Sequence, residues 1–447
     1  WYDTAGREIR TTNAEGNVLS EYTYDKQNRI LQSVDAKGMV TAYGYDAAGQ
    51  VITTKQGAKG ARQADGTYQM TGEVRTTSYA YDDLGRTTAV TDALQGVSSV
   101  QYDSLGRIRS MSDPNQNAVG SGSSYTYQYG TNGLLERETN AIGNTTDYQY
   151  NDRMLLEKKT DSAGEDTIYT YDSLNRVESV RDALGTITYT YDRNGNITEV
   201  KEKESGLLGT VRTVNRTYDN LNRVTSYTDY QGRTVSYGYD ELGNRTQVNY
   251  PGGEIVRYTY RADGTVSGMS GEHFGKTAYS YDRYGRLARI QRADGSEETR
   301  SYDTAGQLIK QTDTDAKGKL LQEQTYSYNV FGEVIEKQVT DPMDTSNLEV
   351  VQMEYNAANR LTKYNGQEVQ YDAKGNMVYG PVDGTMQHLT YDCRNRLVEA
   401  GGISYEYDAE NTRTASVCGK KRTEYVTDTS GSLSRLLLAY EADGTTT

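Results

Sequence analysis

A Tyr-Asp dipeptide recurs along the whole chain of 447 residues. The tyrosine of this dipeptide, or of a degenerate copy, stands at Tyr218, Tyr239, Tyr260, Tyr281 and Tyr302, with 21 residues from each to the next. Other steps range from 16 to 36 residues, which indicates a unit of 21 residues with insertions and deletions. A chain with so short a period folds as a row of similar units that pack on their neighbours, and not as two to four globular domains.

Each unit begins with a strand that runs into a tight turn. Tyrosines two residues apart, such as Tyr22 and Tyr24, place both rings on one face of a strand. The third residue after the Asp is Gly or Asn in every unit except that of Met154, and these two residue types tolerate positive φ. An Asp that caps the turn amides, followed by a left-handed residue, predicts a type I turn that closes a hairpin.

The second half of each unit predicts the return strand and a further turn. An Arg and an aliphatic residue follow the first turn, as in Arg29-Ile30, and a second turn such as Asp182–Gly185 leads to the next Tyr strand. Nineteen such units give about 38 strands, and a twisted antiparallel sheet of that width does not stay flat, so the ribbon must coil. We therefore predict an all-β fold, a long antiparallel β-ribbon of repeats of about 21 residues. The structural repeat motif is expected at Tyr22, Tyr24, Asp25, Asn28, Arg29, Tyr43, Tyr45, Asp46, Gly49, Tyr81, Asp82, Gly85, Tyr102, Asp103, Gly106, Tyr171, Asp172, Asn175, Tyr239, Asp240, Gly243, Tyr281, Asp282, Gly285, Tyr302, Asp303, Gly306, Tyr391, Asp392 and Asn395.

The composition limits the core that this ribbon can have. Hydrophobic residues make up 35% of the chain, and that figure includes 41 Tyr. Such a chain cannot fill a thick, dry core along its whole length, so at least one face of the sheet must be wet. Low hydrophobicity with 25% charged residues is also typical of disorder, but the evenly phased tyrosines and turn glycines favour a folded ribbon.

The distribution of charged and apolar residues excludes two classes of partner. The formal net charge is -14, and the 48 basic residues are spread along the chain without a long Lys/Arg-rich run, whereas nucleic-acid binding needs clustered positive charge. The longest apolar run, Leu436–Ala439, is far shorter than the roughly 20 residues that cross a bilayer. We therefore expect no nucleic-acid partner and no membrane span.

The unit Tyr-x-Tyr-Asp-x-x-Gly/Asn-Arg-aliphatic resembles the YD or Rhs repeat family, and the resemblance covers essentially the whole chain. The stretch from Tyr405 to Gly444 is similar to the late repeats of Rhs cores. The resemblance implies a ribbon that spirals into a hollow shell or part of one. In Rhs and wall-associated toxins and in insecticidal toxin complexes such a shell encloses a C-terminal toxin, and in teneurins it is part of a cell-surface adhesion receptor.

One feature of the Rhs family has no counterpart in this sequence. Rhs cores usually end in an autoproteolytic site of the type Asp-Pro-x-Gly-Leu, but neither Asp113-Pro114 nor Asp341-Pro342 is followed by Gly-Leu. We therefore expect residues 1–447 to be a single shell segment of a longer bacterial protein, secreted or at the cell surface. The expected partners are its own C-terminal toxin domain or neighbouring shell segments beyond Thr447.

The sequence contains no recognisable catalytic motif. The two histidines, His273 and His388, belong to no His-Glu-x-x-His pattern, and no nucleophile elbow or phosphate-binding loop occurs. Asp-led turns make paired carboxylates so common that no single pair indicates acid–base chemistry. We expect no enzymatic activity and no catalytic residues.

No metal or cofactor site is expected either. Asp313–Gly318 begins like a calcium-binding EF-hand loop, but Lys317 and Gln324 stand where a ligand oxygen and a bidentate Glu are needed. Cys393 and Cys418 could pair, but two cysteines cannot make a four-ligand zinc site. We expect both to be incidental thiols.

The tyrosines and the insertions leave two functions open. Exposed rings could stack on sugars of cell-surface glycans, but rings that recur at one phase favour a structural ladder in which they pack on each other. Insertions between Tyr45 and Tyr81, at 112–124, at 201–213 and at 340–347 are expected to form edge loops. The leading hypothesis is a non-enzymatic shell segment that encloses a toxin. The alternative is an extracellular adhesion or carbohydrate-binding module.

Overall fold

The computed structural model describes residues 1–13, 16–113, 124–206, 208–273, 275–341, 351–355, 360–428, 430 and 435–441. All regular elements in these ranges are β-strands, labelled β1 to β40. Nothing in the described ranges forms a helix long and apolar enough to cross a membrane. The predicted all-β antiparallel class is confirmed. The chain divides into two compact units, Trp1–Gly122 with Gly275–Leu348 and Ser123–Phe274 with Glu349–Thr447.

In the first unit, the strands form two runs of antiparallel hairpins, β1 to β9 and β24 to β29, and within each run a strand pairs with the next. The strands are β1 Arg10–Thr12, β2 Val18–Tyr24, β3 Ile30–Asp35, β4 Met39–Tyr45, β5 Val51–Arg62, β6 Tyr68–Tyr81, β7 Thr87–Thr91, β8 Val97–Tyr102, β9 Ile108–Ser112, β24 Gly275–Tyr281, β25 Leu287–Gln291, β26 Glu297–Tyr302, β27 Leu308–Thr314, β28 Leu320–Tyr328 and β29 Val334–Thr340.

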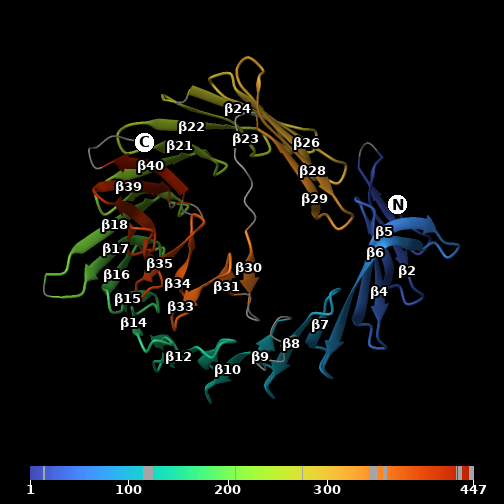
Figure 1. Ribbon diagram of the computed structural model, residues 1–447, viewed down its shortest axis with the longest axis horizontal. Coiled ribbons are helices and arrows are strands. Elements are labelled where there is room, and N and C mark those ends of the chain that lie inside the picture. The colour runs from blue at the N-terminus through green and yellow to red at the C-terminus, as the bar shows by residue number, and fades with distance from the viewer. Residues whose placement is uncertain are drawn as a thin grey trace. The chain divides into compact units, whose positions relative to one another are not determined.

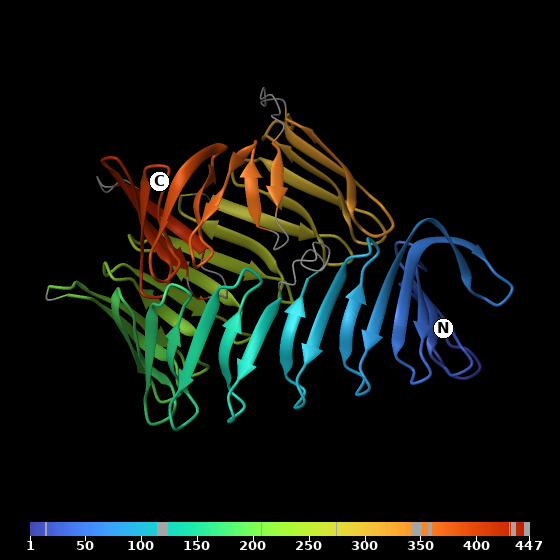
Figure 2. The ribbon, with the colours of Figure 1, turned by 60° about the horizontal axis from the view of Figure 1, so that its bottom comes forward.

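The second unit contains a longer run of hairpins and two smaller sheets, β30–β32 and β33–β40. Figure 2 shows consecutive strands of the run, coloured teal to green, side by side in chain order. The strands of the run are β10 Tyr125–Tyr129, β11 Leu135–Thr139, β12 Thr145–Tyr150, β13 Leu156–Thr160, β14 Asp166–Tyr171, β15 Val177–Arg181, β16 Gly185–Tyr191, β17 Ile197–Glu204, β18 Val211–Tyr218, β19 Val224–Thr228, β20 Thr234–Tyr239, β21 Arg245–Asn249, β22 Ile255–Tyr260 and β23 Val266–Gly271. The remaining strands are β30 Met353–Tyr355, β31 Leu361–Tyr364, β32 Gln367–Glu368, β33 Gln370–Tyr371, β34 Met377–Val382, β35 Thr385–Tyr391, β36 Leu397–Ala400, β37 Ile403–Tyr407, β38 Arg413–Cys418, β39 Lys421–Asp428 and β40 Arg435–Glu441.

The hairpin turn after each Tyr strand has the predicted geometry. At Asp25 the backbone N–H donates to the carbonyl of Arg29 over 2.9 Å, and the N–H of Asn28 donates to the carbonyl of Asp25 over 3.2 Å. The φ of Asn28 is 64°, and the strand register shifts between Thr23 and Tyr24. A type I turn with a left-handed residue and an adjacent β-bulge is a favoured short hairpin connection. The predicted turn is therefore confirmed.

Two of the predicted edge loops are wrong. The long insertion before Tyr81 and residues 201–213 lie mostly in strands, since β5 pairs with β6 and β17 pairs with β18 along most of their lengths. The two inserted arms pair with each other, as Ala58 does with Thr71 and Glu202 with Arg212, so they lengthen a hairpin instead of forming a loop. The predicted loop at 112–124 lies largely outside the described residues, as does that at 340–347.

The second unit contains the main hydrophobic core. Val200, Val214, Val235 and Val248 project from β17, β18, β20 and β21 and are between 0% and 3% exposed. They belong to one cluster with Val426 of β39, which shows that the C-terminal strands cover this part of the run. Figure 1 shows these strands, in orange to red, against the green ones. The core is therefore local and thin, as the composition predicts.

Replacing Met154 by Gly will stabilise the protein by about 1 kcal/mol. Met154 has a φ of 60° at a turn position where Gly or Asn stands elsewhere, and its side chain is 62% exposed, so the change removes backbone strain without loss of a core contact. Chemical denaturation of both proteins measures the difference. The matched control is Gly195→Met, which places a side chain in open space at a φ of 89° and should destabilise by a similar amount.

Candidate functional site

In many repeats the turn Asp is held by both backbone and side-chain donors. In the turn of β6 and β7, the Asp82 carboxylate accepts the backbone N–H groups of Leu84 and Arg86 over 3.0 and 2.9 Å. It also accepts the Arg86 Nε–H over 2.7 Å. The hydrogen bond from the Arg86 guanidinium has the largest effect, and together with the backbone bonds it holds the pKa of Asp82 below its usual range. The same Asp–Arg pair occurs at Asp3–Arg7, Asp25–Arg29, Asp103–Arg107, Asp172–Arg176, Asp219–Arg223, Asp282–Arg286 and Asp392–Arg396.

In several repeats the Arg of the turn also reaches the next hairpin. Arg223 bonds its own turn at Asp219 over 2.6 Å and donates through Nη1 to the carbonyl of Asp240, in the next turn of this type, over 3.2 Å. Its guanidinium lies 4.5 Å from the centre of the Tyr239 ring, a cation–π contact. Equivalent contacts join Arg7 to Tyr24, Arg29 to Tyr45, Arg86 to Tyr102, Arg176 to Tyr191, Arg286 to Tyr302, Arg360 to Tyr371 and Arg396 to Tyr407.

The second tyrosine of the motif completes the link between hairpins. The Tyr239 hydroxyl donates over 2.8 Å to the carbonyl of Val224, the first residue of the preceding return strand. Burial raises the pKa of Tyr239, so the hydroxyl stays protonated. The same bond joins Tyr24 to Glu8, Tyr45 to Ile30, Tyr81 to Val51, Tyr102 to Thr87, Tyr150 to Leu135, Tyr171 to Leu156, Tyr191 to Val177, Tyr218 to Ile197, Tyr260 to Arg245, Tyr302 to Leu287, Tyr328 to Leu308, Tyr371 to Leu361 and Tyr407 to Leu397.

The predicted ladder of rings packed on rings is thus replaced, at these positions, by alternating Tyr and Arg side chains. Where a ring has both a nearby guanidinium and an engaged hydroxyl, as at Tyr24, Tyr45 and Tyr239, it offers little for sugar stacking. The first tyrosines of the motif are used differently: the Tyr43 hydroxyl lies 3.3 Å from Ser33 Oγ on the neighbouring strand. The Arg that follows the turn was visible in the sequence, but its role across hairpins depends on strand register.

Removing one motif hydroxyl measures this link. Tyr239→Phe should lower the free energy of unfolding by about 1 kcal/mol, because the Val224 carbonyl loses its donor while the ring is kept. Tyr125→Phe is the control: Tyr125 is 39% exposed and stands four residues before the motif position, Tyr129, in its strand, so its change should stay within about 0.5 kcal/mol. Equal losses for the two variants would contradict a special role of the motif hydroxyl.

Within the second unit, the C-terminal strands are joined to the run by ion pairs. Lys374 bonds Asp161 over 2.9 Å and also contacts Glu165. Arg394 bonds Asp182 and Glu202, each over 2.6 Å. These contacts place basic residues of later turns against acidic residues of earlier ones, which the sequence could not show because the pairs are separated by about 200 residues in the chain.

Two further pairs continue this interface. Arg216 of β18 bonds Glu410 over 2.5 Å. Asp428, at the end of β39, accepts the Tyr237 hydroxyl over 2.9 Å and an Arg245 nitrogen over 2.5 Å. Although burial opposes ionisation, Ser430 and Arg245 keep the pKa of Asp428 below its usual range. The interface therefore combines an apolar cluster with buried, paired charges.

Asp408 is the exception among the turn carboxylates. It follows Tyr407 as the motif requires, but Thr412 stands four residues later, where many turns have Arg and others have Asn or Gln, and Arg413 comes one residue after it. Asp408 is 1% exposed, and its Oδ2 has no hydrogen-bond partner in the described structure. Burial, with a smaller contribution from the nearby Glu410 charge, raises the pKa of Asp408 to about 6.

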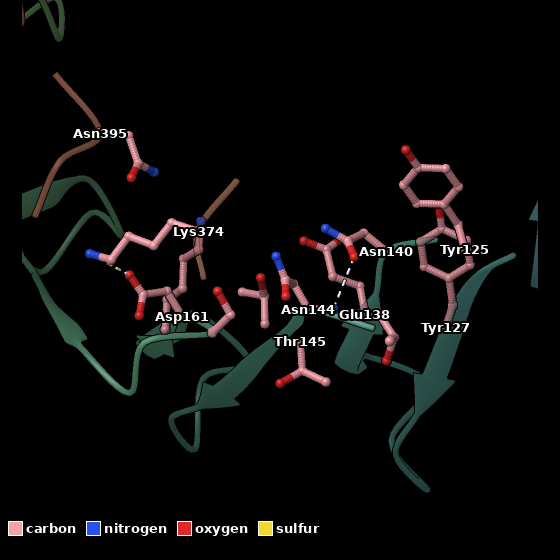
Figure 3. Close-up of a pocket in the computed structure, with 13 residues that line it drawn as sticks. Tyr125, Tyr127, Glu138, Asn140, Asn144, Thr145, Asp161, Lys374 and Asn395 are labelled. Atoms are coloured by element: carbon pink, nitrogen blue, oxygen red, sulfur yellow. Dashed lines mark hydrogen bonds and ion pairs between the residues drawn. The ribbon is translucent and has the colours of Figure 1, made fainter. Parts of the chain in front are cut away.

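A polar cavity of about 320 Å³ lies beside the same interface. Figure 3 shows Tyr125 and Tyr127 on one side, Asn144 in the middle, and Lys374 with Asp161 on the other side. The Nδ2 of Asn144 is buried and has no partner in the described structure. The cavity presents donors and acceptors, and its Lys374 is paired with the two carboxylates of Asp161 and Glu165.

The other candidate groups are placed as follows. His273 pairs with Glu254, which raises the pKa of His273, and the His388 ring lies 4.9 Å from that of Tyr379. Asp315 begins the turn between β27 and β28. In the ranges that the structure describes, no three His, Cys, Asp or Glu residues are grouped to hold a metal. Both cysteines are free thiols. Of the two Asp-Pro sites, only Asp113 and Asp341 are described; Pro114, Pro342 and the residues that follow them lie outside the described ranges.

The repeat geometry agrees with a known family. A model of the RHS Repeat matches residues 2–38, 24–62, 75–118, 171–204 and 218–255. The chain is therefore an all-β protein that carries Rhs repeats, and its resemblance to the YD or Rhs repeat family is confirmed. No curated protein sequence matches it.

Solved structures show where this fold occurs. A chain in the crystal structure of TcdB2-TccC3 is similar with a TM-score of 0.55 and 15% identity, over 100% of this chain and 29% of that chain. For TcdB2-TccC3-Cdc42 the TM-score is 0.50 at 15% identity, with coverage of 100% and 29%. For the Photorhabdus luminescens Tc holotoxin pore it is 0.50 at 15% identity, with coverage of 95% and 27%. The chain thus shares the fold of these chains and spans less than a third of their length.

Proposed function

We propose that this chain is a wall segment of a shell that encloses a C-terminal toxin in a secreted bacterial protein of the Rhs type. The observation that carries the proposal is the alignment of 95% of the chain, as one Rhs-type ribbon, with a chain of a Tc holotoxin. The role is mechanical and not enzymatic. The partners are the toxin domain of the same protein and neighbouring shell segments beyond Thr447.

The repeat motif supports this role. A wall needs consecutive hairpins to be fastened without a thick core, since a thick core would need apolar residues that the chain lacks. The Tyr–carbonyl bond, together with the Arg bridge in the repeats that have this Arg, supplies such fastening, and the groups that form it belong to the motif itself. A face of the ribbon is then free to be polar, as the inner surface of a container for a folded or unfolded protein must be.

The test uses the full-length protein. Its mass is measured under native and then denaturing conditions, together with limited proteolysis of the native form. One native mass that separates into two chains on denaturation, with a C-terminal piece that resists protease until denaturation, is the expected result. A single chain with a protected C-terminal piece indicates an uncut cargo and still supports enclosure. A C-terminal piece that is digested at once in the native protein excludes enclosure.

A further inference from the structure

The left-handed position, which is the third residue after the Asp or Asn that begins a motif turn, holds Asn in some repeats and Gly in others. The φ of Asn222 is 62°, and that of Gly243, in the next repeat, is 88°. Glycine adopts positive φ without strain, whereas the Cβ of Asn makes this conformation less favourable. The choice of Asn therefore needs a reason outside its own turn.

The Asn side chains at the left-handed position accept hydrogen bonds from the preceding motif turn. The Oδ1 of Asn222 accepts the Nδ2–H groups of Asn194 and Asn196 over 2.9 and 2.8 Å. The Oδ1 of Asn395 accepts an Nδ2–H of Asn376 over 3.0 Å. Arginines donate in the same way over 2.8 Å, in the pairs Arg7–Asn28 and Arg153–Asn175. Consecutive hairpins are thus joined through this side chain.

The donor is shared between its own turn and the next one. The Nδ2 of Asn196 donates to its own Asp192 over 2.8 Å and also to Asn222. Arg223 divides its bonds likewise, with Nε to its own turn and Nη1 to the next, but its longer side chain reaches the backbone carbonyl of Asp240. A short donor therefore needs an acceptor on a side chain, whereas an Arg that reaches the carbonyl does not.

The glycines at the left-handed position face the same donors. A Cβ added at Gly106 would lie 3.0 Å from Nη1 of Arg86, and one added at Gly243 would lie 3.9 Å from Nη1 of Arg223. An added Cβ would also lie within 4.0 Å of a side-chain nitrogen of the preceding turn at Gly49, Gly85, Gly306 and Gly375. In these repeats Gly leaves room for the donor, and in the others Asn bonds it.

We infer that the donor side chain of one motif turn selects the residue at the left-handed position of the next turn, with Asn where the donor stops short of the backbone carbonyl and Gly where an Arg reaches it. The left-handed position is then a recognition site by which a hairpin binds its neighbour within the ribbon. Met154, the one residue there that is neither Gly nor Asn, follows a turn with Leu134 in place of the donor. The inference holds whether or not the chain encloses a toxin.

The first test deletes an acceptor in the full-length protein and follows amide hydrogen exchange in the affected turn. Asn222→Gly removes the bonds from Asn194 and Asn196, so exchange in the turn at 219–223 should be about threefold faster. Asn222→Asp keeps an acceptor oxygen and should restore most of the protection.

The matched control makes the same change where the acceptor is not used. Asn411 has a φ of 65°, but the preceding Arg396 donates to the carbonyl of Asp408 over 3.1 Å, and no bond from Arg396 to the Asn411 side chain is described. Asn411→Gly should therefore leave exchange in its turn unchanged or make it slower, because Gly relieves the strain of positive φ.

Adding an acceptor gives an independent test. Asn244 donates to its own Asp240 over 2.9 Å, but Gly264 follows it and has no side chain to accept a further bond, so Gly264→Asn should slow exchange in the turn at 261–265. In the control Gly195→Asn, the preceding Arg176 already donates to the Asp192 carbonyl over 3.4 Å, and exchange should become faster. Equal effects of Asn222→Gly and Asn411→Gly, or equal effects of the two Gly→Asn variants, would overturn the inference.

Discussion

Asp408→Asn will raise the stability of the second unit at pH 7.5 by about 2 kcal/mol. Asp408 is buried, and one oxygen has no partner in the described structure, so its charged form is disfavoured and its pKa rises to about 6. Asparagine keeps an oxygen for the two turn amides of Glu410 and Thr412 and removes the charge. Thermal or chemical unfolding at pH 7.5 measures the gain.

The sign of the pH dependence follows from the raised pKa. The folded protein binds the Asp408 proton more tightly than the unfolded chain, so this group stabilises as pH falls from about 7 toward 4, and the contribution is lost as pH rises through about 6. The difference between the wild type and Asp408→Asn should therefore shrink between pH 7.5 and 5. Glu21 has the opposite effect on stability. Burial alone would raise its pKa, but hydrogen bonds from Lys59 and Arg10 lower it to about 2. Its contribution to stability is therefore lost only as pH falls below about 4.5.

The matched control is Asp392→Asn. Asp392 caps the same kind of turn one repeat earlier, but it accepts the Arg396 Nε–H over 2.7 Å. Its replacement removes a charged partner and should destabilise at pH 7.5, opposite in sign to Asp408→Asn. Destabilisation by Asp408→Asn at pH 7.5 would mean that a water molecule or a cation binds the Asp408 carboxylate. The unpaired Oδ2 would then not lower the stability of the wild type.

Arg394→Met will destabilise the second unit by about 3–5 kcal/mol. The side chains of Arg394, Asp182 and Glu202 are 11%, 9% and 6% exposed, so the change leaves two buried carboxylates without their cation. Although burial opposes ionisation, Arg394 holds the pKa of Asp182 below its usual range. Hydrogen exchange should show faster exchange in β35 and β36, because Arg394 lies in the turn between them.

Two further variants separate loss of the pair from a general defect. Adding Asp182→Asn and Glu202→Gln to Arg394→Met removes the unpaired charges and should restore most of the stability, since neutral replacement of a buried ion pair costs little. Lys421→Met breaks the exposed Lys421–Glu441 pair, in which Lys421 is 67% exposed, and should change stability by less than about 1 kcal/mol. No recovery in the triple variant would show that Arg394 acts by packing and not by charge.

The local structure of this chain was predictable from residue types. Asn28 and the turn glycines predict positive φ, because other residues pay steric strain there, and alternating tyrosines predict strands with a fixed face. The two wrong loops have a physical reason as well. Insertions between repeats were expected to leave the sheet, but hairpin pairing lengthens at little cost when both inserted arms pair with each other.

The candidate interface was not predictable in the same way. Asp408 looks like any other turn Asp, and only its burial under the packed strands makes the missing Arg at position 412 matter. Likewise, Arg394 and Asp182 are ordinary turn residues until the chain brings them to 2.6 Å.

The sequence alone determined the repeat, the hairpin turns and the antiparallel class, because these depend on φ preferences and side-chain alternation within about 21 residues. Only the tertiary structure decided which Arg bridges which hairpins, which carboxylate is left unpaired, and where the C-terminal strands pack. Those outcomes depend on contacts between segments up to about 200 residues apart, and the free energy of such contacts comes from burial and charge pairing that no local pattern contains.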